Sequence, residues 1–310
     1  MGAKLYKYTG ADVVDKAFSK DDKCSFKCSY PKDFNDPYEL FLTIDYDQDA
    51  ELLAFYQETI GNIPQLPTTC FSKSPDVVPM WAHYSHNHSG VVIEVDEEKL
   101  SEAFPDIGFG DIDYRNEPDE DILDLLHRAI VTCKTRHTYL LQRGVFGAAY
   151  YTKNTCWNYE QERRLIASPE DCVEVNGLVF IQIPNDCITS LIVGHKATSE
   201  TKSNIEALAN NLGCSYYEMH IGRSNSKPYF INSNQSVHTY SGSGIIECDN
   251  TCETCNEPIP EGKENCPWCS IEQSHEMSAA GRNPMRMLES MGRLKDYYKK
   301  MDEIGKGSDK

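Results

Sequence analysis

The sequence predicts an α+β fold, in which a body with a mixed or antiparallel sheet precedes a small cysteine-rich lobe and a terminal helix. First, strand-like and helix-like stretches are interspersed along residues 1–230, a length that suits one folded body. Second, residues 231–247 are polar and contain several glycines and serines, which is typical of a linker. Third, paired cysteines occur within residues 248–272, and a helical pattern follows in the tail, residues 273–310.

The body is expected to contain several strands, each a short run of alternating or β-branched residues. The expected strands are residues 4–9, 68–74, 90–96, 162–168, 177–183, 190–195 and 215–222. A further strand is expected at the beginning of the segment 25–39. Amphipathic periodicity and capping residues predict helices between these strands. The expected helices are a short one at 12–20, then 49–61, a short helix or loop at 81–90, a long helical region at 119–144, and 199–213. Pro31 and Pro37 place a turn within 25–39, because proline restricts the residue before it.

The bulk composition limits the partners and the location that we expect. The chain has 310 residues, 40% of them hydrophobic, and a formal net charge of −18 at pH 7. A surface this negative repels phosphate backbones, so nucleic acid is not expected as a broad-surface partner. The chain contains no run of about 20 apolar residues and no apolar signal-peptide core, so we expect a cytoplasmic protein without a membrane partner. Its 13 cysteines fit that setting if they are reduced and some of them bind metal.

Two Cys-x-x-Cys pairs predict a metal site in the lobe. Each pair can form a tight turn that directs two thiolates at one ion, and four thiolates complete a tetrahedral Zn²⁺ site without an open position. Such a site is structural, and it supplies the folding free energy of a lobe that is too small for a core of its own. Acidic residues around the cysteines favour a protein contact over nucleic acid. The expected zinc ligands are Cys252, Cys255, Cys266 and Cys269.

The tail pattern predicts an amphipathic helix with one apolar stripe. Residues at three- and four-residue spacing share a helix face. The residues of this stripe are Met287, Leu288, Met291, Leu294, Tyr298 and Met301. We expect the stripe to mediate formation of a homo-oligomer or to pack on the body, because methionine-rich faces adapt to partner surfaces.

Four motifs occur in a fixed order over roughly residues 4–200. They are "LYKY" (5–8), "FNDP" (34–37), "CFS" (70–72) with "MWAHY" (80–84), and "WNYEQER" (157–163). This order resembles that of a large prokaryotic family of domains of unknown function. The resemblance does not include the cysteine lobe or the tail. Since the family name implies no chemistry, the function must be inferred from the residues themselves.

Within the last motif, Glu160-Gln161-Glu162 resembles the Glu-x-Glu element of ADP-ribosyltransferases. If this triplet leads into a strand, both carboxylates share one face, because side chains two residues apart point the same way. The resemblance implies an ADP-ribosyltransferase-like sheet and NAD as co-substrate. It also implies transfer of ADP-ribose to a protein or other macromolecular acceptor, in phage defence or in a toxin-like role. The chain has no Gly-x-Gly-x-x-Gly, so a Rossmann mode of NAD binding is not indicated.

The same resemblance implies roles for individual residues. Glu162 is the expected catalytic carboxylate, which stabilises an oxocarbenium-like transition state, and Glu160 orients the acceptor or the ribose. His83 completes the expected catalytic set and shapes the nicotinamide pocket. The residues expected to bind the cofactor are Tyr6, Lys7, Tyr8, Asn35, Asp36, Ser72, Trp81 and Tyr84.

Two non-enzymatic interpretations remain open. In the first, the carboxylates of the Glu160-Gln161-Glu162 triplet have a structural role and form ion pairs with nearby cations. The cations within reach in sequence are Lys153, Arg163 and Arg164. In the second, the body senses a ligand or binds a protein partner, and the zinc lobe and the tail helix mediate assembly. This second interpretation makes the chain an interaction module instead of an enzyme.

A metal-dependent hydrolase or nuclease is a further alternative. The stretch "HYSHNH" contains His83, His86 and His88, and imidazole is a common metal ligand. His83 and His86 suit one turn of a helix, whereas His86 and His88 suit one face of a strand. No single regular geometry directs all three rings at one ion.

Overall fold

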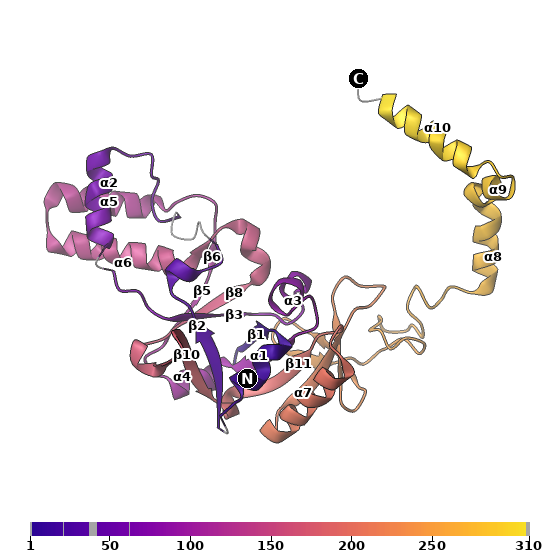
Figure 1. The fold of residues 1–310 in the computed structure, drawn as a ribbon, viewed down its shortest axis with the longest axis horizontal. Helices are drawn as coiled ribbons and strands as arrows, with labels where there is room; N and C mark the ends of the chain where they lie inside the picture. Colours follow the sequence, from indigo (N-terminus) through magenta and orange to yellow (C-terminus); the bar gives the residue numbers. More distant parts are fainter. Residues whose placement is uncertain (1, 21, 37–41, 62, 308–310) are drawn as a thin grey trace. The chain divides into compact units, whose positions relative to one another are not determined.

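The computed structural model describes residues 2–20, 22–36, 42–61 and 63–307. The chain divides into two compact units, Met1–Cys248 and Asp249–Lys310. The first unit combines helices with mixed and mostly antiparallel sheets, so the predicted α+β class is confirmed (Figure 1). No helix among the described residues has both the length and the apolar character that a membrane crossing requires.

The largest sheet of the described residues has ten strands, in the order β15-β14-β13-β12-β11-β4-β1-β3-β8-β5. Neighbouring strands pair antiparallel except for β11 and β12, which are parallel. The strands are β1 (Lys4–Thr9), β3 (Thr68–Ser72), β4 (Val91–Asp96), β5 (Gly108–Asp111), β8 (Glu162–Ile166), β11 (Ile188–Val193), β12 (Ser215–His220), β13 (Tyr229–Asn232), β14 (Val237–Tyr240) and β15 (Ile245–Glu247).

Strand β1 lies near the middle of this sheet and positions the pocket described below. Its sequence "KLYKYT" alternates, so Tyr6 and Tyr8 pack into one hydrophobic cluster and Leu5 packs into another on the opposite face. The strand pairs with β4 along its whole length, whereas with β3 it shares only the pair Tyr6↔Ser72. The sheet is therefore weakly joined between β1 and β3.

The segment 231–247, for which the sequence predicts a linker, belongs to the sheet. It contains the last two residues of β13 and all of β14 and β15, and the first unit ends only at Cys248. Val237 is buried, and Tyr240 packs edge-on against Tyr6 at 5.9 Å between ring centroids. The polar, glycine-containing composition reflects short antiparallel strands and their turns, in which few side chains are buried.

Two smaller sheets and a helical layer complete the first unit. One small sheet has the order β2-β10-β9 and the other pairs β6 with β7. The strands are β2 (Lys23–Cys28), β6 (Asp113–Tyr114), β7 (Thr152–Lys153), β9 (Cys172–Val175) and β10 (Leu178–Pro184). The helices are α1 (Ala11–Ala17), α2 (Ala50–Ile60), α3 (Val78–Tyr84), α4 (Glu97–Ala103), α5 (Glu120–Thr132), α6 (Thr135–Tyr151) and α7 (Ser199–Leu212). Helices α2, α5 and α6 form a bundle with its own buried core (Figure 1).

The region 119–144, expected to be helical throughout, contains a break between α5 and α6. Cys133 ends α5 in the left-handed conformation, with φ of 51°, and its backbone N–H donates to Ala129 O. The chain then reverses, so the two helices pack against each other around Leu126 and Leu141. A left-handed residue ends a helix in the same way that glycine often does, and here no glycine signals it in the sequence.

In the second unit the tail forms three helices instead of one. They are α8 (Gln273–Arg282), α9 (Pro284–Ser290) and α10 (Leu294–Gly307). Pro284 cannot continue α8, and the Asn283 side chain instead caps α9. Gly292, with φ of 70°, separates α9 from α10. Residues 308–310 of the predicted tail lie outside the described residues.

Candidate functional site

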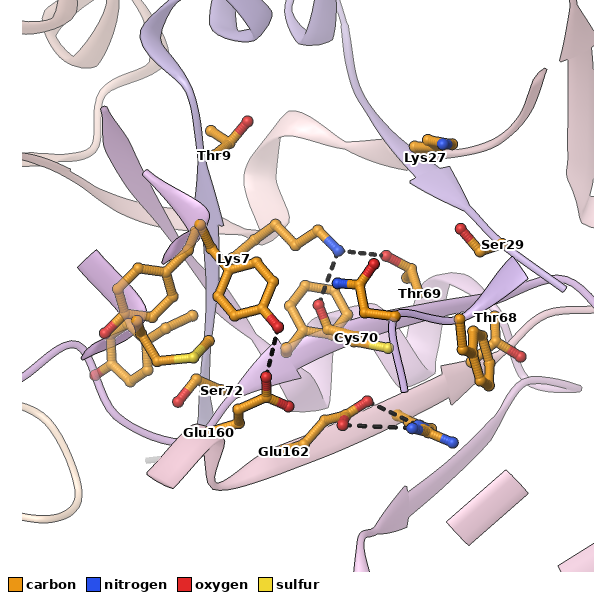
Figure 2. Close-up of a pocket in the computed structure, with 18 of the residues that line it drawn as sticks. Lys7, Thr9, Lys27, Ser29, Thr68, Thr69, Cys70, Ser72, Glu160 and Glu162 are labelled. Carbon is orange, nitrogen blue, oxygen red and sulfur yellow. Dashed lines mark hydrogen bonds and ion pairs between the residues drawn. The ribbon is translucent and has the colours of Figure 1, made fainter. Parts of the chain in front are cut away.

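A pocket of about 380 Å³ opens in the first unit where β1 and β3 separate (Figure 2). Its walls come from β1, α1, β2 and the turn after it, β3, α3 and the segment Lys153–Arg164. That volume lies within the usual range of small-molecule sites. Segments far apart in the sequence thus meet at one concave surface.

Most of the residues that the sequence singles out for catalysis or cofactor binding line this pocket. They are Tyr6, Lys7, Tyr8, Asn35, Ser72, Tyr84, Glu160 and Glu162. The structure therefore places the N-terminal strand, the Phe-Asn-Asp turn and both glutamates around one space. Pro37, the last residue of that turn motif, lies outside the described residues.

Three of the expected site residues do not line the pocket. Trp81 is fully buried in the core, where its Nε1–H donates to Pro75 O at 2.8 Å. Asp36 is buried beside the pocket without forming part of its wall. His83 is exposed, and its ring lies 6.2 Å from that of Tyr159, centroid to centroid. The expectation that His83 shapes the pocket is therefore not met.

The two glutamates converge, although not through strand alternation. Glu160 ends a 3₁₀ helix, Thr155–Glu160, and Glu162 begins β8. Gln161 between them is left-handed, with φ of 46°, and is exposed. This conformation is uncommon for a residue other than glycine, and it turns the chain so that both carboxylates enter the same buried space.

Lys153 joins the two carboxylates, and Arg164 binds one of them. The Lys153 Nζ donates to Glu160 at 2.6 Å and to Glu162 at 3.1 Å. The Arg164 Nε donates to Glu162 at 2.7 Å, and its NH1 donates to Tyr150 O at 2.8 Å. Lys153, Glu160, Glu162 and Arg164 each have 5% exposure or less. The ion pairs that the sequence offered as a structural alternative thus exist, with Lys153 and Arg164 as the cations.

These cations hold Glu162 in its ionised form. Burial alone raises the pKa of Glu162, but the charges of Arg164 and Lys153 outweigh it and lower the pKa to about 2. The backbone N–H of Glu162 also donates to the Tyr114 hydroxyl at 2.8 Å. A carboxylate with so low a pKa is a poor proton acceptor near pH 7, and it acts instead as a fixed negative charge.

Tyr84 and Lys7 add two further polar groups to the pocket wall. The Tyr84 hydroxyl donates to Glu160 at 2.5 Å, and burial, followed by this carboxylate, raises the Tyr84 pKa. The Lys7 Nζ donates to Thr69 Oγ1 and to Cys70 O, both at 2.8 Å. Burial lowers the pKa of Lys7, because it disfavours the charged amine. Figure 2 shows Lys7 reaching across the gap between β1 and β3.

The three histidines of "HYSHNH" point to different neighbours. The His88 ring packs against the His195 ring at 4.9 Å, and the exposed His86 ring lies 3.5 Å from Asp12. Together with the exposed His83, they form no cluster of metal-ligating atoms within the part of the chain that the structure describes. The geometry therefore gives no support to a hydrolase or nuclease that uses these three residues.

In the second unit, four cysteines lie close together and could bind a metal such as zinc. The thiol sulfurs of Cys252, Cys255, Cys266 and Cys269 all lie within 4.8 Å of one another. The Cys255 and Cys266 sulfurs are 3.8 Å apart, and sulfurs about 2.3 Å from a tetrahedral centre are separated by about that distance. The donor set and its spacing thus fit Zn²⁺.

The backbone around Cys252 favours the thiolate that a metal needs. Burial alone raises the pKa of Cys252, but hydrogen bonds from the backbone N–H groups of Cys266, Cys255 and Thr254 lower it to about 6. The thiolate is the form that ligates metal ions. Four thiolates leave no open position, so the site suits a structural ion and not a catalytic one.

We expect metal analysis of the purified chain to give about one zinc per chain. Cys266→Ser should lose the metal and make the segment 249–272 sensitive to limited proteolysis, because the metal supplies the lobe's folding free energy. Cys156→Ser, at an exposed cysteine outside the cluster, should keep both the metal and the protease resistance. A zinc-free wild-type chain with a protease-resistant lobe contradicts the zinc assignment.

Some pocket residues carry no signal that a sequence alone offers. Lys27 and Ser29 come from β2 and the residues just after it, and Thr69 comes from β3. None belongs to a recognisable motif, and only the pairing of β3 with β1 and β8 places Thr69 beside Lys7. The topology of the sheet, which sequence periodicity does not encode, brings these side chains to the site.

Residues 80–165 match the model of a family described as "Protein of unknown function (DUF2971)". The expected resemblance to a family of unknown function is therefore confirmed for this segment. The segment includes Tyr84, Lys153, Glu160 and Glu162, whereas Lys7 lies outside it. No curated protein and no solved structure matches the chain. The chemistry of the pocket itself must therefore indicate the function.

Proposed function

We propose that the chain binds NAD in the pocket between β1 and β3 and transfers ADP-ribose from it to a macromolecular acceptor. One observation carries the proposal: a single pocket collects Glu160 and Glu162 with Lys7 and the aromatic ring of Tyr84. These are the groups that an ADP-ribosyltransferase-like site needs, namely a fixed carboxylate, a cation for the phosphates and aromatic surface for the nicotinamide.

In this proposal Glu162 acts by its charge. The glycosidic bond between ribose C1 and the nicotinamide nitrogen breaks, and its electron pair leaves with nicotinamide. Positive charge then develops on the ribose, and a carboxylate held ionised nearby stabilises that charge without reorganising. The acceptor's nucleophilic atom forms the new bond to C1, and its proton passes to solvent water. Glu160, fixed by Tyr84 and Lys153, orients the ribose or the acceptor.

The buried ion pairs also favour a second function, in which the pocket binds a ligand without chemistry. Lys153 and Arg164 neutralise much of the charge of Glu160 and Glu162, and a fully paired network forms a rigid wall. The chain is then a ligand-sensing or protein-interaction module. Exposed apolar side chains of the tail, such as Met287 and Met301, would mediate assembly with a partner or a second copy.

The two functions predict different outcomes for bound NAD: the transferase consumes it, and the ligand-sensing module leaves it intact. We expect the wild-type chain to bind NAD, measured by calorimetry, and to release nicotinamide from it, measured by chromatography. With NAD labelled in the adenine, we expect label on a macromolecule when lysate proteins are supplied as acceptors. Binding with intact NAD supports the ligand-sensing module. A chain that neither binds nor consumes NAD rules out the transferase proposal.

A further inference from the structure

The end of the pocket away from the glutamates has a different chemical character. It collects cations and hydroxyl groups from three strands: Lys7 from β1, Lys27 and Ser29 from β2 and its end, and Thr69 from β3. Figure 2 shows Lys27, Ser29 and Lys7 on the opposite side of the pocket from Glu160 and Glu162. The two ends therefore differ: the carboxylates of Glu160 and Glu162 are paired with Lys153 and Arg164 at one end, whereas Lys7 and Lys27 lie at the other.

Lys7 is the central group of the positive end. Its Nζ donates to two uncharged acceptors, Thr69 Oγ1 and Cys70 O. Among the described residues, no carboxylate oxygen forms an ion pair with it within 4.0 Å. Lys27 is exposed at the same pocket and adds a second positive charge, while the exposed Asp33 is the acidic residue on this part of the wall. The charge of a partly buried amine without a carboxylate partner is costly, and a bound anion offsets that cost.

The hydroxyl groups increase the capacity of this end for an anion. The Thr69 oxygen already accepts from Lys7, so the Thr69 hydroxyl proton remains available to another acceptor. Ser29 lines the same wall and can donate in the same way. Two ammonium groups and two hydroxyl donors suit the oxygens of a phosphate or a diphosphate, which accept several hydrogen bonds at once. In a chain of net charge −18, this local excess of cations requires a specific explanation.

We propose that Lys7, Lys27, Ser29 and Thr69 form a subsite for the diphosphate of a nucleoside diphosphate. The assignment rests on the proposed function in one respect: it places the ribose of the ligand toward Glu160 and Glu162. The binding of the diphosphate itself requires no reaction. The ligand class is therefore an anionic nucleotide, and adenosine without phosphates is a poor ligand.

The test is calorimetric binding of ADP, inorganic pyrophosphate and adenosine to the full chain. We expect ADP to bind, pyrophosphate to compete with it, and adenosine to bind at least about tenfold more weakly than ADP, since hydrogen bonds to charged groups are lost. Lys7→Met and Lys27→Met should each weaken ADP binding by about tenfold or more. Lys23→Met is the matched control, because it removes the same charge from β2 at a residue outside the pocket, and it should leave ADP binding unchanged.

The outcomes distinguish this subsite from the transferase proposal. ADP binding that depends on Lys7 and Lys27, in a chain that leaves NAD intact, supports the subsite and rejects the transferase. NAD consumption that neither variant alters supports the transferase and overturns the subsite. Equal affinity for ADP and adenosine also overturns it. If circular dichroism shows that Lys7→Met does not fold, ADP binding by the variant at the exposed Lys27, Lys27→Met, tests the subsite alone.

Discussion

Glu162→Gln is expected to lower the rate of NAD turnover by roughly a hundredfold or more, with little change in the affinity for NAD. The carboxylate stabilises charge that develops only in the transition state, so its loss affects turnover more than binding. Turnover is measured as nicotinamide release, and affinity by calorimetry. Glu97→Gln is the matched control, because Glu97 pairs with Arg163 and lies outside the pocket. It should retain wild-type turnover.

The buried pairs of Glu162 require a second control, since Glu162→Gln also affects stability. The glutamine oxygen can still accept from Arg164, but its amide N–H groups then face the Lys153 ammonium. Turnover must therefore be compared at a temperature at which each variant is folded. Arg164→Met destabilises the same network while it keeps the carboxylate, so it should retain far more turnover per folded molecule than Glu162→Gln. Equal losses in the two variants contradict a catalytic role for Glu162.

Arg164→Met is expected to lower the free energy of unfolding of the first unit by roughly 3 to 5 kcal/mol. Arg164 is 1% exposed, and its loss removes a buried partner from Glu162 and a hydrogen bond from Tyr150 O. Its guanidinium also lies 4.6 Å from the centre of the Phe34 ring. Urea denaturation followed by tryptophan fluorescence measures the change. A loss below about 1 kcal/mol contradicts the role of this network in stability.

Arg163→Met provides the comparison for that measurement. Arg163 is the next residue in β8 and forms ion pairs with Glu97 and Asp111, but its side chain is 23% exposed and that of Asp111 is 53% exposed. These pairs are more exposed to solvent than those of Arg164, so we expect a smaller loss of stability than for Arg164→Met. The double variant of Glu162→Gln with Arg164→Met should be more stable than the sum of the single losses predicts, because the two side chains interact directly.

The low pKa of Glu162 also determines how the free energy of unfolding changes in acid. Its folded-state pKa, about 2, lies below the ordinary value of 4.5, so the folded state favours the ionised form. The resulting stabilisation is complete above about pH 4.5 and is lost as the pH falls toward about 2. The same urea experiment at several pH values should therefore show a smaller loss of stability in this window for Glu162→Gln than for the wild type.

Local patterns in the sequence predicted much of the site, and the order of the strands did not follow from them. The alternation of "KLYKYT" predicts β1, and the spacing of Cys252 and Cys255 brings both thiols to one turn whatever surrounds them. In contrast, the convergence of Glu160 and Glu162 depends on the left-handed conformation of Gln161. Glutamine does not favour this conformation, so the sequence does not predict it. The composition of 231–247 was misleading, because short strands with few buried side chains resemble a linker in sequence.

The position of β1 in the sheet has a consequence for how the chain folds. This strand precedes both of its partners in sequence, yet it lies between β4 and β3. Its apolar residues Leu5, Tyr6 and Tyr8 remain uncovered until those later segments are available to pair with it. Pairings between distant segments slow folding, and unpaired strand edges promote aggregation. We therefore expect nascent or refolding chains to aggregate most readily before β3, β4 and β8 have assembled, a stage at which no pocket exists and no ligand can rescue them.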